Sequence, residues 1–222
     1  MTKFQSNRGS ICQKHKVAEI IRRLENQYPD ARISLSYNSP LELLVATILS
    51  AQCTDACVNK ITPKLFSRYK TALDYANASL AELELFIRST GFYHIKAERI
   101  IGMAQMLQET YSGQVPCTME QITTLPGVAR KTGNVVLYNA YGITEGIAVD
   151  THVTRFSMRV GLSNASNPDI IEKDLMQQIP KEKWGEFTHL VIAHGRAICV
   201  AKKAKCTSCT LNGLCMYFNN IQ

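Results

Sequence analysis

A lysine and an aspartate in the middle of the chain have the residue types needed for covalent chemistry on a phosphate-containing substrate. Lys131 follows a Pro-Gly turn that opens directly into a helical pattern of apolar residues. The first turn of a helix leaves backbone NH groups unpaired and carries partial positive charge, so it suits a phosphate. That charge and Arg130 disfavour the ammonium form of Lys131, which favours a nucleophilic free amine. Asp150 supplies a carboxylate at the start of the next helical pattern.

Both residues also have ordinary structural interpretations. A lysine in the first turn of a helix is usually solvated. Asp150 precedes the apolar period Val153, Phe156 and Val160, and an aspartate at that position commonly caps the helix. Taken alone, the two residues leave catalysis and simple solvation or capping open.

Four cysteines near the end of the sequence have the spacing of a ligand set. Six, two and five residues separate Cys199, Cys206, Cys209 and Cys215. Thiolates at this density bind tetrahedral zinc or an iron-sulfur cluster. A zinc ribbon usually has two Cys-x-x-Cys pairs, whereas this pattern has one pair flanked by single cysteines. The spacing therefore favours an iron-sulfur cluster over zinc.

The chain carries an excess of positive charge. Lysine and arginine number 25 against 18 acidic residues, a formal charge of +7, which permits a polyanionic partner without proving one. Lys202, Lys203 and Lys205 lie between the first two of the clustered cysteines. Lysines on a loop pinned at both ends are typical of a phosphate contact surface, although many such loops are only solvated.

Length and composition indicate an ordinary globular protein. A chain of 222 residues with 45% apolar content can bury the core of one or two domains. No apolar run reaches the ~20 residues of a membrane span, and residues 1–10 lack the apolar centre of a signal peptide. Eight cysteines in such a chain argue for metal ligation or free thiols over a disulfide framework. We therefore expect a cytoplasmic location and no membrane partner.

Helical periodicity dominates the chain, and no segment alternates strongly enough for a strand, so we expect an all-α fold. Ser39 and Pro40 are typical of the cap and first position of a buried, central core helix over residues 41–50. Pro63 predicts a bend or break in the following helix. Capping boxes are predicted at Ser79 and at Thr118. Short joints connect the predicted helices, as in a compact bundle.

Two further pairs of side chains are more simply structural. Cys53 and Cys57 lie four apart without other ligands nearby, so we interpret them as small buried side chains and not as a metal site. His189 and His194 are five apart on one predicted helix and face different directions, so they do not form a ligand pair, and each is expected to make ordinary hydrogen bonds in the core or beside a site.

Several of these stretches, in this order, resemble endonuclease III, a DNA base-excision glycosylase of the helix-hairpin-helix superfamily. The resemblance runs from about residue 40 to residue 217. It is carried by LPGVARKT at 125–132, VDTH at 149–152 and the four-cysteine spacing, with LSAQ at 49–52 and HGR at 194–196. Two positions depart from the usual pattern: Ala129 stands where a second glycine is common, and Gly133 where alanine is common.

The resemblance implies roles for individual residues. Lys131 would be the nucleophile, Asp150 the catalytic carboxylate, and the four cysteines would hold a 4Fe-4S cluster that shapes a DNA-contacting loop. Gln52 would fill the gap left by a flipped base, and Phe92 occupies a wedge position where relatives often have leucine. The other DNA contacts implied are Gly127, Ala129, Arg130, Lys202, Lys203 and Lys205.

The resemblance also implies an architecture and an activity. It predicts two helical domains, a helix-hairpin-helix glycosylase fold with an iron-sulfur cluster loop: a six-helix domain at 33–143, and a cluster domain from 1–32 and 144–222. The implied protein is a monomeric bifunctional N-glycosylase and AP lyase, associated with the nucleoid if bacterial. It would remove oxidised pyrimidines from duplex DNA that carries a damaged base or abasic site, and nick the strand by β-elimination through a lysine Schiff base. Asp150 would accept the lysine's proton or stabilise positive charge on the sugar, and the sequence leaves both roles open.

Other classes of protein make different demands on these residues. A non-catalytic helix-hairpin-helix module that only binds DNA would need neither Lys131 nor Asp150. A relative specialised for mispaired adenine normally lacks the lysine and has a further C-terminal domain. An iron-sulfur electron carrier would not need the hairpin. A covalent complex with abasic DNA would distinguish the lyase from all three.

Overall fold

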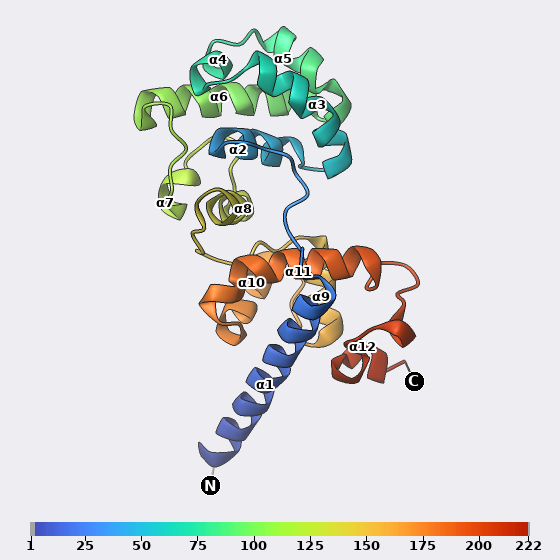
Figure 1. Ribbon diagram of the computed structural model, residues 1–222. Helices are drawn as coiled ribbons and strands as arrows, with labels where there is room; N and C mark the ends of the chain where they lie inside the picture. The colour runs from blue at the N-terminus through green and yellow to red at the C-terminus, as the bar shows by residue number, and fades with distance from the viewer. Residues whose placement is uncertain (1–2, 222) are drawn as a thin grey trace. The chain divides into compact units, whose positions relative to one another are not determined.

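The structure, a computed structural model, describes the backbone of residues 3–221 and the side chains of residues 15–221. Across that range every regular element is a helix and no strand is present, which confirms the all-α prediction. The chain divides into two compact units, one formed by Ile33–Glu145 and the other by Met1–Arg32 together with Gly146–Gln222 (Figure 1). None of the described helices has the length and apolar character that crossing a membrane requires.

The unit Ile33–Glu145 is organised around the buried helix α2 (Pro40–Leu49). Ser39 Oγ accepts a hydrogen bond from the Glu42 backbone NH at 3.2 Å, and Pro40 occupies the first helical position, as predicted. Three helices contact α2 directly, α4 and α5 pack on α6, and α7 packs on α8. The elements that surround α2 are α3 (Asp55–Arg68), α4 (Ala72–Ala76), α5 (Leu80–Ile87), η1 (Arg88–Thr90), α6 (Tyr93–Tyr111), α7 (Met119–Ile122) and α8 (Arg130–Tyr141).

At Pro63 of helix α3 the sequence indicated a bend or break, and the break does not occur. The helix runs without interruption from Asp55 to Arg68. Pro63 is exposed, whereas Val58 and Leu65 on the opposite side are buried in the core. Proline removes one backbone donor, and the apolar contacts of the buried face outweigh that loss.

The capping box predicted at Ser79 does not form. Ser79 is the N-cap residue of α5, but its side chain makes no capping hydrogen bond. Glu82, which would complete the box, is instead paired with Arg68 Nε at 2.9 Å. A complete capping box is present one helix earlier, between Thr71 and Asp74. Local sequence could not separate these sites, because Arg68 comes from a different helix.

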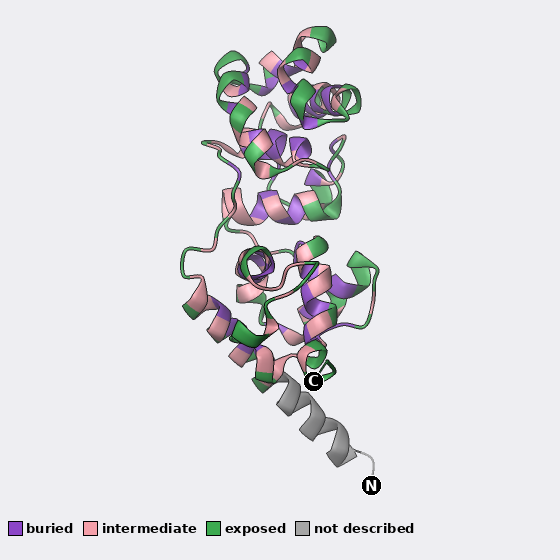
Figure 2. Cartoon of the chain, turned by 90° about the vertical axis from the view of Figure 1, so that its right-hand side faces the viewer, coloured by how far each residue is buried: buried purple, intermediate pink, exposed green. Residues whose placement is uncertain are grey.

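The second unit joins helix α1 (Lys3–Gln27) to the helices that follow residue 146. Its core includes Ile20 and Leu24 of α1 together with Phe156 and Phe187, whose rings meet edge to face at a centroid distance of 6.1 Å. Buried residues lie on helix faces turned toward the interior of each unit (Figure 2). The remaining elements are α9 (Thr151–Val160), α10 (Pro168–Gln178), η2 (Lys181–Lys183), α11 (Trp184–Ala197), η3 (Cys206–Ser208), η4 (Asn212–Leu214) and α12 (Met216–Asn219).

Candidate functional site

The turn before α8 is built on one glycine that its backbone requires. Gly127 has φ of +80°, in the left-handed region, and a Cβ placed there would lie 3.1 Å from Arg99 Cβ. Ala129, by contrast, has φ −88° and ψ 168°, an extended conformation that any L-residue adopts. The alanine that departs from the usual family pattern therefore imposes no backbone strain. It is the N-cap of α8, and its methyl group cannot bond the NH groups of the first turn.

Lys131 lies in the first turn of α8 and its side chain is exposed. The helix beneath it is anchored by Val136 and Leu137, which are fully buried. Gly133 allows α7 to approach closely, because a Cβ there would lie 2.8 Å from Met119 Sδ and 3.1 Å from an Ile122 methyl carbon. A rigid, close-packed helix start thus presents one primary amine to solvent, next to backbone NH groups that suit an anion.

Asp150 is the N-cap of α9, as the sequence predicts. Its Oδ1 accepts hydrogen bonds from the backbone NH groups of His152 and Val153, both at 2.8 Å. The face of α9 formed by Val153, Phe156 and Val160 is buried. Both bonds go to one carboxylate oxygen. Asp150 belongs to the second unit and Lys131 to the first, and a catalytic role for either stays a prediction at this point.

Backbone strain marks three of the residues predicted to contact DNA. Within the described range, four residues other than glycine have positive φ: Gln52 (53°), Phe92 (50°), Ser112 (51°) and Lys203 (56°). This conformation is uncommon for side chains of this size, and strained residues concentrate at functional sites. Phe92 is also 62% exposed, a large apolar surface for a side chain outside the core. Gln52 and Phe92 were predicted from the family resemblance and Lys203 from the lysine-rich loop, so the backbone strain is an independent indication.

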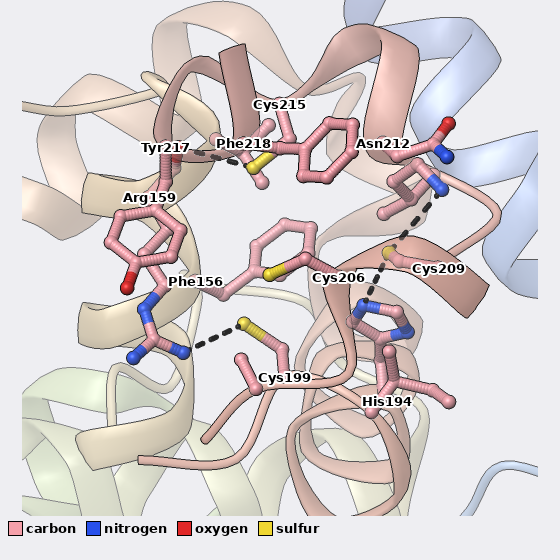
Figure 3. Close-up of a pocket in the computed structure, with 14 residues that line it drawn as sticks. Phe156, Arg159, His194, Cys199, Cys206, Cys209, Asn212, Cys215, Tyr217 and Phe218 are labelled. Carbon is pink, nitrogen blue, oxygen red and sulfur yellow. Dashed lines mark hydrogen bonds between the residues drawn. The ribbon is translucent and has the colours of Figure 1, made fainter. Parts of the chain in front are cut away.

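The four clustered cysteines line one cavity in the second unit (Figure 3). Cys209 Sγ accepts a hydrogen bond from the Leu211 backbone NH at 3.4 Å, and Cys199 Sγ accepts one from the Arg159 guanidinium at 3.4 Å. Donors of this kind stabilise thiolate sulfur. Without a bound group, burial raises the pKa of the Cys206 and Cys209 thiols.

The described side chains around this cavity are not arranged around a single metal ion. A zinc ion would require ligand atoms about 2.3 Å from one point. Among the residues that the structure describes, no three His, Cys, Asp or Glu side chains are placed to hold a metal ion in that way. Which metal group the four cysteines bind stays a prediction.

His194 lies beside the cysteine cavity and is almost fully buried. Its Nε2 is 3.6 Å from Cys209 Sγ, and its Nδ1 is 3.2 Å from the Tyr28 hydroxyl. Burial lowers the pKa of His194 to about 4, so the imidazole is neutral at neutral pH. His189 is buried too, and burial lowers its pKa in the same direction. Both histidines lie in the core, as the sequence predicts.

Two arginines of α9 hold the loop that follows Cys199, and sequence reasoning did not find them. Arg155 Nε donates to the Cys199 carbonyl at 2.9 Å. Arg159 donates to the carbonyls of Val200 and Ala201 at 2.8 and 3.1 Å, and its guanidinium lies 4.9 Å from the centre of the Tyr217 ring. The only sequence signal was a pair of arginines spaced by one helical turn. The loop they fix presents Lys202, Lys203 and Lys205, all exposed.

Comparison with known proteins assigns this chain to a family. Residues 45–181 match the family described as HhH-GPD superfamily base excision DNA repair protein. Endonuclease III from Synechocystis sp. is 51% identical over 208 residues, which cover 94% of this chain and 95% of that protein. The chain belongs to the endonuclease III family. Endonuclease III from Escherichia coli K12 is 39% identical over 204 residues, covering 92% and 96% of the two chains.

Solved structures agree with membership of the endonuclease III family. One is a trapped covalent endonuclease III–DNA intermediate with an estranged adenine; it has a TM-score of 0.89 and 43% identity and covers 94% of this chain and 98% of its own. A thermostable thymine-DNA glycosylase, 24% identical with a TM-score of 0.81 over 93% of this chain and 98% of its own, shares the fold. The predicted helix-hairpin-helix glycosylase fold is thereby confirmed.

Proposed function

We propose that this chain is a bifunctional DNA N-glycosylase and AP lyase that acts in base excision repair. The observation that carries the proposal is the exposed amine of Lys131 in the first turn of α8, behind the Gly127 turn, in a chain of the endonuclease III family. A protein that only binds DNA through this hairpin does not need an amine at that position. Lys131 is therefore the group that distinguishes an enzyme from a binding module.

The chemistry follows from a neutral amine at Lys131. Its nitrogen attacks C1′ of the damaged nucleotide while the bond from C1′ to the base breaks, and the base leaves with the electron pair and takes up a proton. The nitrogen loses a proton, the sugar ring opens, and a protonated Schiff base forms. Loss of a C2′ proton then expels the 3′ phosphate, which nicks the strand, and water releases Lys131.

Asp150 supplies the carboxylate for this sequence of steps. It either takes the proton that Lys131 must lose or stabilises positive charge on the sugar as the base departs. Its two hydrogen bonds from backbone NH groups fix the side chain as the helix cap. A carboxylate held in one place is suited to both roles.

The partner is double-stranded DNA that carries an oxidised pyrimidine or an abasic site. Support comes from a non-covalent endonuclease III–DNA complex, which is 43% identical to this chain. The start of α8, with Gly127, Ala129 and Arg130, binds one phosphate through its NH groups and charge. Lys202, Lys203 and Lys205 contact other phosphates. A base inside a duplex cannot be reached, so the nucleotide is extruded, while Gln52 fills the gap and Phe92 enters the stack.

The four cysteines hold a 4Fe-4S cluster in this proposal. Their shared cavity, and the donors aimed at Cys199 and Cys209, fit thiolate ligands. When bound, the cluster cross-links the loop of Lys202, Lys203 and Lys205 to the body of its unit, and it takes no part in the excision steps. We infer a monomer that works in the cytoplasm on nucleoid DNA.

Borohydride trapping tests the lyase directly. Borohydride reduces the Schiff base, so wild-type protein becomes covalently attached to duplex DNA with an abasic site, and Lys131→Ala does not. Lys60→Ala, which removes an exposed lysine from α3, is the matched control and is trapped like wild type. If wild-type protein binds this DNA but never becomes attached, the lyase proposal fails and the non-catalytic binding module is the better reading.

Salt dependence tests the lysine loop separately. Each lysine that neutralises a phosphate contributes about one unit to the slope of log affinity against log salt. Alanine at Lys202, Lys203 or Lys205 should lower the slope by about that amount, whatever the DNA sequence. A slope that does not change with all three replaced would show that the loop is only solvated.

A further inference from the structure

Lys96 is a buried cation that bridges two chain segments within the unit Ile33–Glu145. Its side chain lies near the start of α6 and is 3% exposed. Nζ donates hydrogen bonds to the carbonyls of Leu49 and Thr90, both at 2.8 Å. Leu49 is the last residue of α2, and Thr90 is the last residue of η1. One ammonium group thus joins the carbonyl ends of two elements that are far apart in sequence.

Each of the bridged elements leads into a strained, exposed residue. The chain leaves α2 through the turn that holds Gln52, and it leaves η1 through the turn that holds Phe92. Both residues have positive φ, at 53° and 50°, and both are exposed. Strained conformations persist only where the surrounding structure enforces them. The bonds of Lys96 fix the base of both turns, so they are placed to enforce this geometry.

An ammonium at position 96 is not what packing alone would favour. Lys96 lies one turn before Ile100, on the apolar face of α6 that continues with Met103, so an apolar side chain would suit the stripe. Burial lowers the pKa of Lys96, and the ionisable groups that act on it are the thiols of Cys53 and Cys57. A buried ammonium group costs free energy of desolvation, and here its two backbone acceptors offset part of that cost.

We propose that Lys96 is a positioning residue that sets the separation and orientation of Gln52 and Phe92 for entry into duplex DNA. This inference rests on the proposed function, in which those two side chains replace the extruded nucleotide and wedge the stack. When the ammonium is removed, the ends of α2 and η1 lose their common donor and the two turns move independently. Extrusion from a duplex then becomes harder, whereas the amine of Lys131 keeps its own support in α8.

The test compares two substrates for each variant. Single-stranded DNA with an abasic site needs no extrusion, so its rate of borohydride trapping reports the amine, and the rate on the matched duplex reports amine and extrusion together. Lys96→Met should lower the duplex to single-strand ratio by about tenfold or more, since small misplacements of positioning groups have effects of this size. Lys96→Arg, which keeps charge and donors, should restore part of the ratio.

Lys16→Met is the matched control. Lys16 Nζ also donates to a backbone carbonyl at 2.8 Å, that of Val160, but it lies in the other unit. The substitution removes the same kind of bond away from the two turns, so the trapping ratio should stay at the wild-type value. Should Lys16→Met lower the ratio as much as Lys96→Met, the effect would be a general loss of stability and the inference would be wrong.

A double-mutant cycle separates positioning from a purely structural role. If Lys96 acts through Gln52 and Phe92, then Lys96→Met should add little to the defect of a variant in which both are alanine; a structural role predicts additive effects. A wild-type ratio in Lys96→Met overturns the inference. If Lys96→Met does not fold, Lys96→Gln is tested instead. Its side chain can still donate to one carbonyl, and its ratio of duplex to single-strand trapping must also lie below the wild-type ratio. Wild-type protein that is trapped on neither substrate would instead refute the proposed function itself.

Discussion

Asp150 combines a structural role with a proposed chemical one, and two substitutions separate them. Asp150→Ala removes the acceptor of two backbone hydrogen bonds, whereas Asp150→Asn keeps a side-chain oxygen in place and removes only the charge. Loss of an N-cap costs about 0.5–2 kcal/mol, and loss of a charge at a helix start costs about 0.3–1 kcal/mol. We therefore expect Asp150→Ala to lower the free energy of unfolding by about 1–2 kcal/mol. Asp150→Asn should lower it by less than about 1 kcal/mol.

In catalysis, unlike in stability, the two substitutions should have similar effects. Either one removes the negative charge, so both should slow single-turnover excision by about 10²–10⁴-fold, the range typical of a lost general base. Urea unfolding measures the free energy of unfolding. Quenched reactions on a duplex with one oxidised pyrimidine measure the excision rate. Excision by Asp150→Asn at the wild-type rate would show that the carboxylate is only a cap. Equal loss of stability in both variants would refute the hydrogen-bond argument.

Three further predictions concern the turn before α8, the helix caps and pH. Gly127→Ala should destabilise the protein by about 1–2 kcal/mol in urea unfolding, because position 127 has positive φ and a Cβ would contact Arg99, whereas Ala129→Gly, at an ordinary φ, should change stability by less; equal effects would contradict this account of the turn. Thr71→Ala should cost about 1 kcal/mol and Ser79→Ala almost nothing, since only Thr71 makes a capping bond; similar unfolding midpoints for both variants would contradict the observed caps. Burial lowers the pKa of His189 in the folded state, so the unfolded chain binds a proton more readily, and stability should fall as the pH drops below about 6.5; His189→Gln should reduce that slope, and an unchanged slope would exclude this residue as a cause.

The features that sequence predicted correctly depend on neighbours in the chain. Ser39 caps α2 and Asp150 caps α9 because each acceptor lies within three residues of its donors. The four clustered cysteines line one cavity, as their closeness in sequence suggests, and their role as ligands stays a prediction. In the two helix caps, the spacing in sequence alone identifies which backbone NH groups the cap residue accepts from.

The features that sequence missed depend on partners from elsewhere in the fold. Ser79 and Thr71 both precede a helix and have an acidic residue three positions later. The capping box at Ser79 does not form, because Arg68 binds the Glu82 carboxylate that the box would need. Lys96 gave one signal, a lysine within the apolar stripe of α6, yet nothing local indicated that Leu49, 47 positions earlier, supplies its acceptor. Arg155 and Arg159 likewise find their carbonyl partners more than a helix away.

The unit that holds the cysteines is assembled from both ends of the described chain, and this affects how the protein is made. Val17, Ile20 and Leu24 of α1 pack against residues that follow Gly146. At ribosomal rates of about 5–20 residues per second, translation of the intervening stretch takes on the order of 10 s. During that interval Ile33–Glu145 is being synthesised, and the apolar face of α1 still lacks the partners that follow Gly146. A nascent chain stalled before Gly146 would therefore expose the apolar face of α1. Such a face is a binding site for chaperones that act on emerging polypeptides.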